Sequence, residues 1–353
     1  MPATASNLVW SESTALVTGA TGLLGSRLVH RLIELGARVV CFVRDHDPAS
    51  ALWFNNDHER VNIVSGRLEA FEQVKTTILE REVDTVFHLG AQTIVGISQR
   101  DPLGSFEANI RGTYHILEAC RLYGDRVRRI LIASSDKAYG ESPNLPYDET
   151  TPLAAKNPYD VSKCCADLIA QSYAHTYQLP IAIARCGNLF GPGDLNWSRL
   201  VPGTIRSLLT DQRPIVRSDG TLVRDYLFVD DAVEAYLAMA NWLETDCACN
   251  DAQRAFNFSP NQPLTVLEMM RRLQDACGRA DLEPVILNEA RGEIPHQHLD
   301  PTRAKHVLGW TAQTNLDDAL AITVEWYRSY LQRFHPGQLA RQPALSFHAR
   351  AGV

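Results

Sequence analysis

Residues 15–183 alternate short apolar runs with longer amphipathic stretches, and this alternation limits the possible folds more than any other feature of the chain. Short apolar runs are typical of buried strands, and longer amphipathic stretches are typical of helices. A chain that repeats strand, helix and strand forms a parallel sheet with helices on both faces. The pattern therefore predicts an α/β fold built around a parallel sheet.

The expected strands lie at residues 15–18, 39–43, 62–64, 85–89, 129–133 and 181–184. Helices are expected between them, notably over residues 25–35, 105–122 and 159–177. After Cys186 the alternation breaks, and helices are expected near residues 202–209, 230–243 and 265–277. We expect a first domain over residues 1–185, to which some later segments return, a smaller C-terminal α/β domain over 186–333, and a flexible tail over 334–353.

The composition excludes several classes of protein. Hydrophobic residues make up 45% and charged residues 21% of the 353 positions, which is the balance of a globular chain. The sequence contains neither a signal peptide nor an apolar run long enough to span a membrane, so a cytoplasmic protein is expected. Lys and Arg number 34 against 41 Asp and Glu, with no basic block, so no nucleic acid partner is expected. The 8 scattered cysteines are expected to be free thiols, without a metal site.

A glycine-rich turn, residues 18–25, follows the first expected strand and opens the first helix. Gly19 permits a tight turn, Gly22 lets the backbone approach a pyrophosphate, and Gly25 permits close packing of helix and strand. The helix N-terminus adds N–H donors for the anion. Because a strand and a helix flank this turn, it predicts a dinucleotide site in a Rossmann-type, doubly wound sheet. The expected cofactor contacts are Gly19, Thr21, Gly22, Leu23, Leu24 and Gly25.

The end of the second expected strand bears on which dinucleotide binds. An acid at this place would hold the ribose of NAD, but the sequence has Val43 there. Arg44 beside it could hold the 2′-phosphate of NADP, whereas Asp45 could turn back to a 2′-hydroxyl. The sequence therefore favours NADP narrowly over NAD. Arg44 can also be interpreted as a solvated surface residue.

Tyr159 and Lys163 stand four residues apart on an expected helix, so both side chains reach one face. A cation beside a phenol favours the phenolate and makes tyrosine a usable base near neutrality. The segment Ser134-Ser135-Asp136-Lys137-Ala138-Tyr139-Gly140 ends another expected strand, at the edge where open α/β sheets bind ligands. Together with the glycine-rich turn, these motifs form a specific combination.

On these motifs the chain resembles the extended short-chain dehydrogenase/reductases, the group of NAD(P)-dependent nucleotide-sugar epimerases and dehydratases. The resemblance runs from Thr14 to about Tyr330 and includes Phe87-His88-Leu89-Gly90-Ala91-Gln92, Arg185-Cys186-Gly187-Asn188, Arg224-Asp225-Tyr226 and Leu308-Gly309-Trp310. It implies that Ser135, Tyr159 and Lys163 form a redox triad and that Ala91 contacts the cofactor. It also implies a homodimer formed through the helices near 105–122 and 159–177, although their apolar faces would fit equally well inside a monomer.

Asp136 and Lys137 discriminate within this group. In the 4,6-dehydratases that the chain resembles, an acid/base pair follows the triad hydroxyl. Asp-Lys is similar to CDP-glucose 4,6-dehydratases and to some UDP-N-acetylglucosamine dehydratases. The resemblance implies a lyase of deoxysugar biosynthesis that converts an NDP-hexose to an NDP-4-keto-6-deoxyhexose. Asp136 would protonate the departing C6 hydroxyl, and Lys137 would either remove the C5 proton as a neutral amine or stabilise the enolate. The alternative interpretation of both residues is an exposed ion pair at a strand end.

The substrate diphosphate requires cations and hydrogen-bond donors in this acidic chain. The resemblance implies Asn188 and Arg224 for this role, with Arg217 and Arg291 as further candidates and Gln92 as a sugar contact; Arg291 can equally be a surface residue. One departure is Gly66-Arg67, where relatives commonly have Gly-Asp at the adenine. A 4-epimerase, a 5,6-dehydratase and a non-catalytic dinucleotide-binding sensor remain alternative functions.

Overall fold

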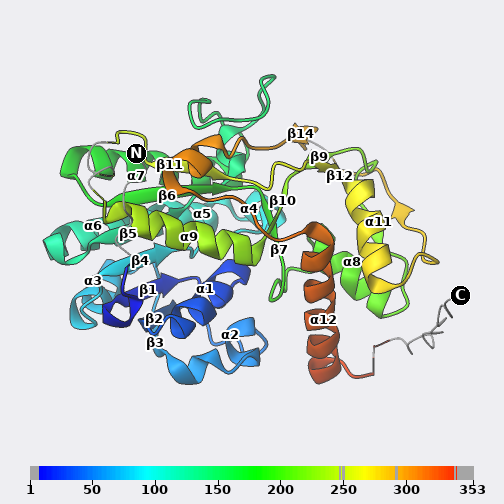
Figure 1. The fold of residues 1–353 in the computed structure, drawn as a ribbon, viewed down its shortest axis with the longest axis horizontal. Helices are drawn as coiled ribbons and strands as arrows, with labels where there is room; N and C mark the ends of the chain where they lie inside the picture. The colour runs from blue at the N-terminus through cyan, green and yellow to red at the C-terminus, as the bar shows by residue number, and fades with distance from the viewer. Residues whose placement is uncertain (1–7, 246–247, 249–250, 291–292, 338, 340–353) are drawn as a thin grey trace, which may run out of the picture.

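The computed structural model describes residues 8–245, 248, 251–290, 293–337 and 339, and its centre is a parallel seven-stranded sheet (Figure 1). The strand order is β11-β6-β5-β4-β1-β2-β3. The bounds are β1 Thr14–Thr18, β2 Arg38–Val43, β3 Asn62–Ser65, β4 Thr85–His88, β5 Arg129–Ala133, β6 Ile181–Cys186 and β11 Ala255–Phe258. The order reverses between β1 and β4, and this reversal opens a crevice at the carboxyl ends of those strands.

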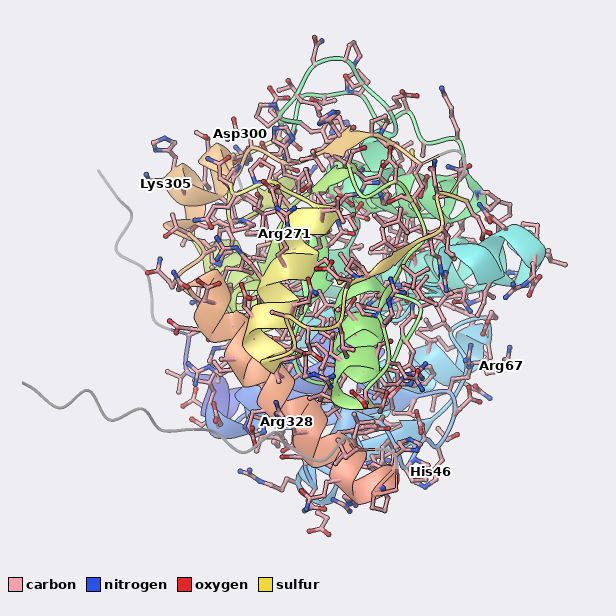
Figure 2. The ribbon with its side chains drawn as sticks, turned by 90° about the vertical axis from the view of Figure 1, so that its right-hand side faces the viewer. His46, Arg67, Arg271, Asp300, Lys305 and Arg328 are labelled. Atoms are coloured by element: carbon pink, nitrogen blue, oxygen red, sulfur yellow. The ribbon has the colours of Figure 1, made fainter. Side chains whose placement is uncertain are left out.

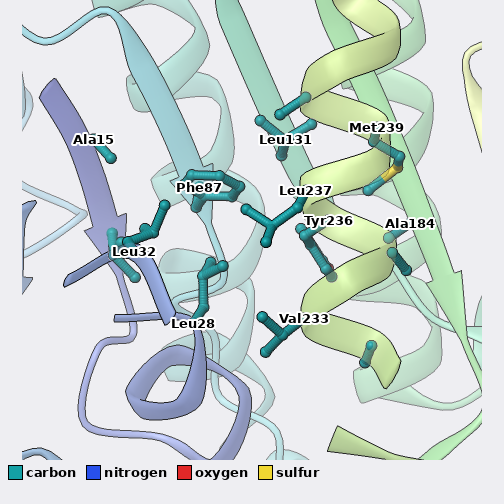
Figure 3. Close-up of a cluster of buried hydrophobic side chains, with 14 of the residues drawn as sticks. Ala15, Leu28, Leu32, Phe87, Leu131, Ala184, Val233, Tyr236, Leu237 and Met239 are labelled. Carbon is teal, nitrogen blue, oxygen red and sulfur yellow. The ribbon is translucent and has the colours of Figure 1, made fainter. Parts of the chain in front are cut away.

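Helices cover both faces of the sheet, as the strand pattern predicts. One face carries α1 Leu23–Glu34 and α9 Val229–Leu243, and the other carries α3 Phe71–Glu80, α6 Gly112–Tyr123 and α7 Pro158–Tyr177. Figure 3 shows the first of these interfaces, where Val233 and Leu237 of α9 meet Leu28 of α1 and Phe87 and Leu131 of the sheet. All five side chains are buried, so this face is held by apolar packing.

The expected strands and helices of residues 15–183 are confirmed with small differences at their ends. The helix expected over 105–122 is interrupted, because α5 Pro102–Phe106 and α6 are joined by a single π-turn at Glu107–Arg111. Short helices that the pattern did not predict are α2 Ala51–Phe54 and α4 Val95–Arg100.

Two elements from the second half of the chain belong to the central sheet. Strand β11 extends the sheet beside β6. Helix α9 packs beside α1 and covers β5 and β6. The helix expected near 230–243 therefore packs on the central sheet, and the prediction allowed later segments to return to the first domain. Helix α9 is apolar on nearly all sides, which is typical of a helix buried by both the sheet and its neighbours.

The remaining elements form a smaller cluster beside the carboxyl edge of the sheet. Helices α8 Leu200–Leu209, α11 Val266–Cys277 and α12 Leu316–Phe334 share an apolar core. Figure 2 faces this side, with Arg271 on the outer surface of α11. Short strand pairs complete the cluster: β7 Asn188–Phe190 with β10 Tyr226–Phe228, β8 Ile215–Val216 with β13 Val285–Ile286, and β9 Val223–Arg224 between β12 Leu264–Thr265 and β14 His296–Gln297.

The domain boundary at 185/186 stays a prediction, and of the expected tail only residues 334–337 and 339 are described. Within the described part of the chain, no helix combines the length and apolar character needed to cross a membrane.

Candidate active site

A cavity of about 880 Å³ lies at the carboxyl edge of the sheet, between the glycine-rich turn, α7 and the smaller cluster. Most of the residues that the sequence analysis singled out line it: Gly19, Thr21, Gly22, Leu23, Leu24, Gly25, Ala91, Ser135, Asp136, Lys137, Tyr159, Lys163, Asn188, Arg217 and Arg224. A contiguous cavity of about 400 Å³ shares Asn188, Arg217 and Arg224 and extends between α8 and β8. The fold therefore brings the glycine-rich turn and both sequence motifs to one place.

The glycine-rich turn has the shape that a pyrophosphate requires. Gly19 has a φ of +72°, and a Cβ atom there would come within 2.8 Å of the Gly90 nitrogen. A Cβ atom on Gly25 would lie 2.0 Å from the Gly19 oxygen, so only glycine permits α1 to start this close to β1. Helix α1 begins at Leu23, and its N-cap residue Gly22 has no side chain to cap it, which leaves the N-terminal donors of the helix facing the cavity. These residues fit a dinucleotide.

Thr18 and His88 fix the two strand ends that border this turn. The Thr18 hydroxyl accepts the N–H groups of Leu89 at 3.1 Å and Gly90 at 2.9 Å. His88 contacts Thr18 through Nδ1 at 2.9 Å and Thr113 through Nε2 at 3.1 Å. Burial lowers the pKa of His88 to about 3, and the Lys163 charge adds to this, so the ring is neutral at physiological pH.

Arg44 does not line the cavity. Its Nε atom pairs with Asp45 Oδ2 at 2.5 Å, and the two side chains are 57% and 68% exposed. Arg67 likewise extends from the surface of the protein (Figure 2). The geometry thus agrees with the interpretation of Arg44 as a surface residue, and the narrow preference for NADP is not supported.

Helix α7 places Tyr159 and Lys163 on the cavity wall. Lys163 Nζ donates to the Ala133 carbonyl at 2.8 Å, which ties α7 to the end of β5. Burial lowers the pKa of Lys163 to about 8, against the opposing effects of Asp167 and Cys186.

The phenol of Tyr159 lines the cavity, and the expected lowering of its pKa by Lys163 stays a prediction. Burial raises the pKa of Tyr159 to about 12, while the Arg199 charge and a hydrogen bond with Ser135 lower it only partly. Lys163, whose Nζ atom donates to the Ala133 carbonyl, is not among the main groups that shift this pKa. Tyr159 therefore needs further positive charge beside it before it can serve as a base near neutrality.

Asp136 and Lys137 are not an exposed ion pair, because their charged ends have different partners inside the site. Ser135 Oγ donates to Asp136 Oδ1 at 3.0 Å and accepts the Lys137 N–H at 3.2 Å. Asp136 is buried, and Lys137 Nζ donates to Gln297 Oε1. Ser135 thus connects the redox pair to the acid that the sequence analysis proposed.

On the substrate side, Arg224 is buried and donates from Nη2 to Glu293 Oε2 at 2.9 Å. Asn188 Nδ2 donates to the Asp225 carbonyl at 3.4 Å, and the exposed Arg217 reaches both cavities. Arg291 lies outside the described residues.

Gln92, expected to contact the sugar, does not line the cavity. Its Oε1 atom accepts the Ile94 N–H at 3.1 Å, so the side chain closes its own loop. Asn109 holds the backbone of the same residue, accepting from Gln92 N at 2.7 Å and donating to Gln92 O at 3.1 Å. Gln92 therefore shapes the site indirectly.

Sequence reasoning missed three functional candidates: Arg199, Asn109 and Gln297. Arg199 lines both cavities, pairs with Asp194 at 3.0 Å and places positive charge near Tyr159. Asn109 also donates to Ser162 Oγ at 2.8 Å and so connects the Gln92 loop to α7. A basic residue at the start of an expected helix was the only sequence signal for Arg199, and Asn109 and Gln297 had none.

Comparison with known proteins identifies the family to which this arrangement belongs. The model of the family "GDP-mannose 4,6 dehydratase" matches residues 16–323. The chain belongs to this family. It is therefore an enzyme of the extended short-chain dehydrogenase/reductase type, which confirms the resemblance and the Rossmann-type fold.

Relatives within the family include both dehydratases and epimerases. The CDP-glucose 4,6-dehydratase of Salmonella typhimurium is 28% identical, with 92% of each chain covered. The UDP-glucose 4-epimerase of Mycolicibacterium smegmatis is 31% identical, covering 90% of this chain and 99% of that one. The crystal structure of dTDP-glucose 4,6-dehydratase from Streptomyces venezuelae, with NAD and TYD bound, is 26% identical with a TM-score of 0.80, covering 92% and 99% of the two chains.

Proposed function

We propose that the protein is a nucleotide-sugar 4,6-dehydratase that converts an NDP-hexose, such as CDP-glucose, to an NDP-4-keto-6-deoxyhexose and water. The observation that carries the proposal is the position of Asp136, a buried carboxyl group on the cavity wall that is hydrogen bonded to Ser135. A dehydratase requires an acid beside the redox pair to protonate a departing hydroxyl. A buried carboxyl group is costly to retain where the reaction does not use it.

Gly19, Gly22 and Gly25 would hold the dinucleotide, which would supply the acceptor and donor of hydride and a positively charged ring. Tyr159, assisted by Ser135, takes the proton of the sugar C4 hydroxyl while C4 is oxidised to a ketone. The ketone acidifies the C5 proton, which a base removes as Asp136 protonates the C6 hydroxyl and water departs. Hydride returns to C6 and a proton to C5, so the product is a 4-keto-6-deoxy sugar with no net change in redox state.

The substrate diphosphate is proposed to bind Arg224 and Asn188, with Arg217 at the opening shared by the two cavities. Arg224 is already desolvated and its guanidinium group is held by Glu293, so a diphosphate would replace one anionic partner with another. For the cofactor we propose NAD, because Asp45 pairs with Arg44 and its negative charge offsets the attraction of Arg44 for a 2′-phosphate.

A homodimer is also proposed, formed through α5, α6 and α7. These helices carry the exposed apolar side chains Leu103, Leu122, Leu168 and Tyr177. Sedimentation of the wild-type protein and of Leu168→Glu tests this proposal, and the expected result is a dimer that the substitution weakens.

A 4-epimerase on the same scaffold is the second candidate function, favoured by the 31% identity to a UDP-glucose 4-epimerase. Incubation with CDP-, UDP-, GDP- and dTDP-hexoses in deuterated water separates the two. We expect loss of water and one deuteron at C5, both abolished by Asp136→Asn. Unchanged mass with inversion at C4 would instead establish an epimerase and remove the proposed role of Asp136.

A further inference from the structure

A buried glutamine in the smaller cluster contacts two residues of the catalytic side from behind the cavity wall. Gln297 lies on β14 and has no exposed surface, and both polar ends of its side chain are used. Its Oε1 atom accepts from Lys137 Nζ, and its Nε2 atom donates to the Asp136 carbonyl at 3.1 Å. Only this orientation of the amide satisfies both partners, because an ammonium group only donates and a carbonyl only accepts.

The charge of Lys137 also acts on a carboxyl group of α7. Burial raises the pKa of Asp160, whereas its hydrogen bond with Asn157 and the charge of Lys137 lower it. Lys137 Nζ is thus hydrogen bonded to the amide oxygen of Gln297 and interacts electrostatically with Asp160. A lysine stem has several freely rotating bonds, and the hydrogen bond to Gln297 restricts them.

Strand register connects Gln297 to the substrate side. Strand β14 runs parallel to β9, with Gln297 opposite Arg224. Arg224 lines both cavities and pairs with Glu293, whose charge also influences Asp160. Strand β9, which carries the proposed diphosphate ligand Arg224, is therefore adjacent to β14, whose Gln297 accepts a hydrogen bond from Lys137.

We infer that Gln297 is a positioning residue, which holds the Lys137 amine against the reacting sugar carbons from the substrate-binding side of the molecule. The inference rests on the proposed dehydratase function. Gln297 does not line the cavity, so it acts through Lys137 and through the backbone of Asp136. Its loss should therefore slow the elimination step while leaving the affinity for the nucleotide sugar nearly unchanged.

Kinetics of three variants test the inference. Gln297→Leu should lower kcat by about 100-fold, the cost expected of a misplaced catalytic group, with KM within about threefold of wild type. Gln297→Glu should recover most of this loss, because a carboxylate oxygen still accepts from Lys137. If Gln297 had a purely structural role, Gln297→Glu would lose more activity than Gln297→Leu, because a buried carboxylate costs more stability than a leucine. The matched control is Gln274→Leu, which removes another buried glutamine, on α11, that donates to the Leu282 carbonyl at 3.0 Å.

A second measurement does not depend on turnover. Trace acetylation with acetic anhydride, followed by peptide mass spectrometry, gives the reactivity of Lys137 relative to the exposed Lys156. We expect Gln297→Leu to raise this ratio at least about fivefold, and Gln297→Glu and Gln274→Leu to leave it unchanged. If no nucleotide sugar is dehydrated by the wild type, the proposed function fails, and the acetylation ratio still decides whether Gln297 holds Lys137. An unchanged ratio in Gln297→Leu, or an equal loss of kcat in Gln274→Leu, overturns the inference.

Discussion

Replacement of Asp167 by leucine should destabilise the fold strongly, because it leaves a buried arginine without its counter-ion. Asp167 on α7 accepts from Arg185 Nε at 2.8 Å and from Arg185 Nη2 at 2.9 Å. The two side chains are 0% and 2% exposed. Arg185 also donates to the Tyr139 hydroxyl at 2.9 Å, and Tyr139 donates to Asn257 at 2.7 Å. The pair thus connects α7, β6 and the segment after Ser135.

The magnitude follows from this burial. Removal of one partner from a buried ion pair costs about 3–5 kcal/mol, since the remaining charge keeps its desolvation penalty and loses its attraction. At about 1.4 kcal/mol for each factor of ten, the unfolding equilibrium constant should rise by about two to four orders of magnitude. The Arg185→Met variant should suffer similarly. The double variant Asp167→Leu/Arg185→Met should recover at least half of the loss, because it buries no unpaired charge.

Urea unfolding followed by circular dichroism measures these differences. Glu234→Gln is the control, because its partner Arg31 lies on the surface and such a pair contributes under about 1 kcal/mol. A cost below about 1 kcal/mol for Asp167→Leu, or additive losses in the double variant, would refute the reasoning.

Three further predictions concern the cofactor side of the site. Between pH 8 and 10.5 the unfolded chain holds a proton on Lys163 that the folded chain has lost, so the contribution of this group to stability rises with pH. The urea midpoint of the wild type should therefore rise relative to that of Lys163→Met, since both chains share the opposing titration of the buried cysteines. Asp45→Ala should release Arg44 and tighten binding of NADP relative to NAD by about tenfold in calorimetry, and tighter NADP binding by the wild type would contradict the proposed preference. Thr18→Val leaves the Leu89 and Gly90 N–H groups without their acceptor and should cost about 1–3 kcal/mol in urea unfolding, whereas a neutral effect would show that other acceptors replace the hydroxyl.

The first half of the fold could be predicted from sequence because its signals are local. The strands from β1 to β6 are apolar runs, and the turn at Gly19 requires glycine for reasons of backbone geometry that the sequence displays directly. Strand β11 was missed because Ala255–Phe258 is short and follows a polar loop, so only its pairing with β6 reveals it. The signal for α9 was present, since its apolar residues surround the helix, but it was interpreted as part of the smaller domain.

Within the site, residue types that carry chemistry were predictable and their contacts were not. Tyr159 and Lys163 share a helix face by spacing, yet the turn of Lys163 to the Ala133 carbonyl depends on where β5 ends. Gln92 carries a group that could bind sugar, but its amide closes its own loop. Gln297 stands 160 positions from Lys137, and no local pattern relates two residues at that separation.

The return of the chain to the sheet at α9 and β11 has a consequence for synthesis of the protein. When residue 186 has been made, β6 still presents an unpaired edge, and the face of β5 and β6 that α9 will cover is open. An unpaired edge beside an apolar face is a template for association with other chains. The sheet can be completed only after Phe258 has left the ribosome, by which time α8 has also been made. Folding of the cofactor half must therefore wait for part of the substrate half, and a fragment ending near residue 185 should aggregate.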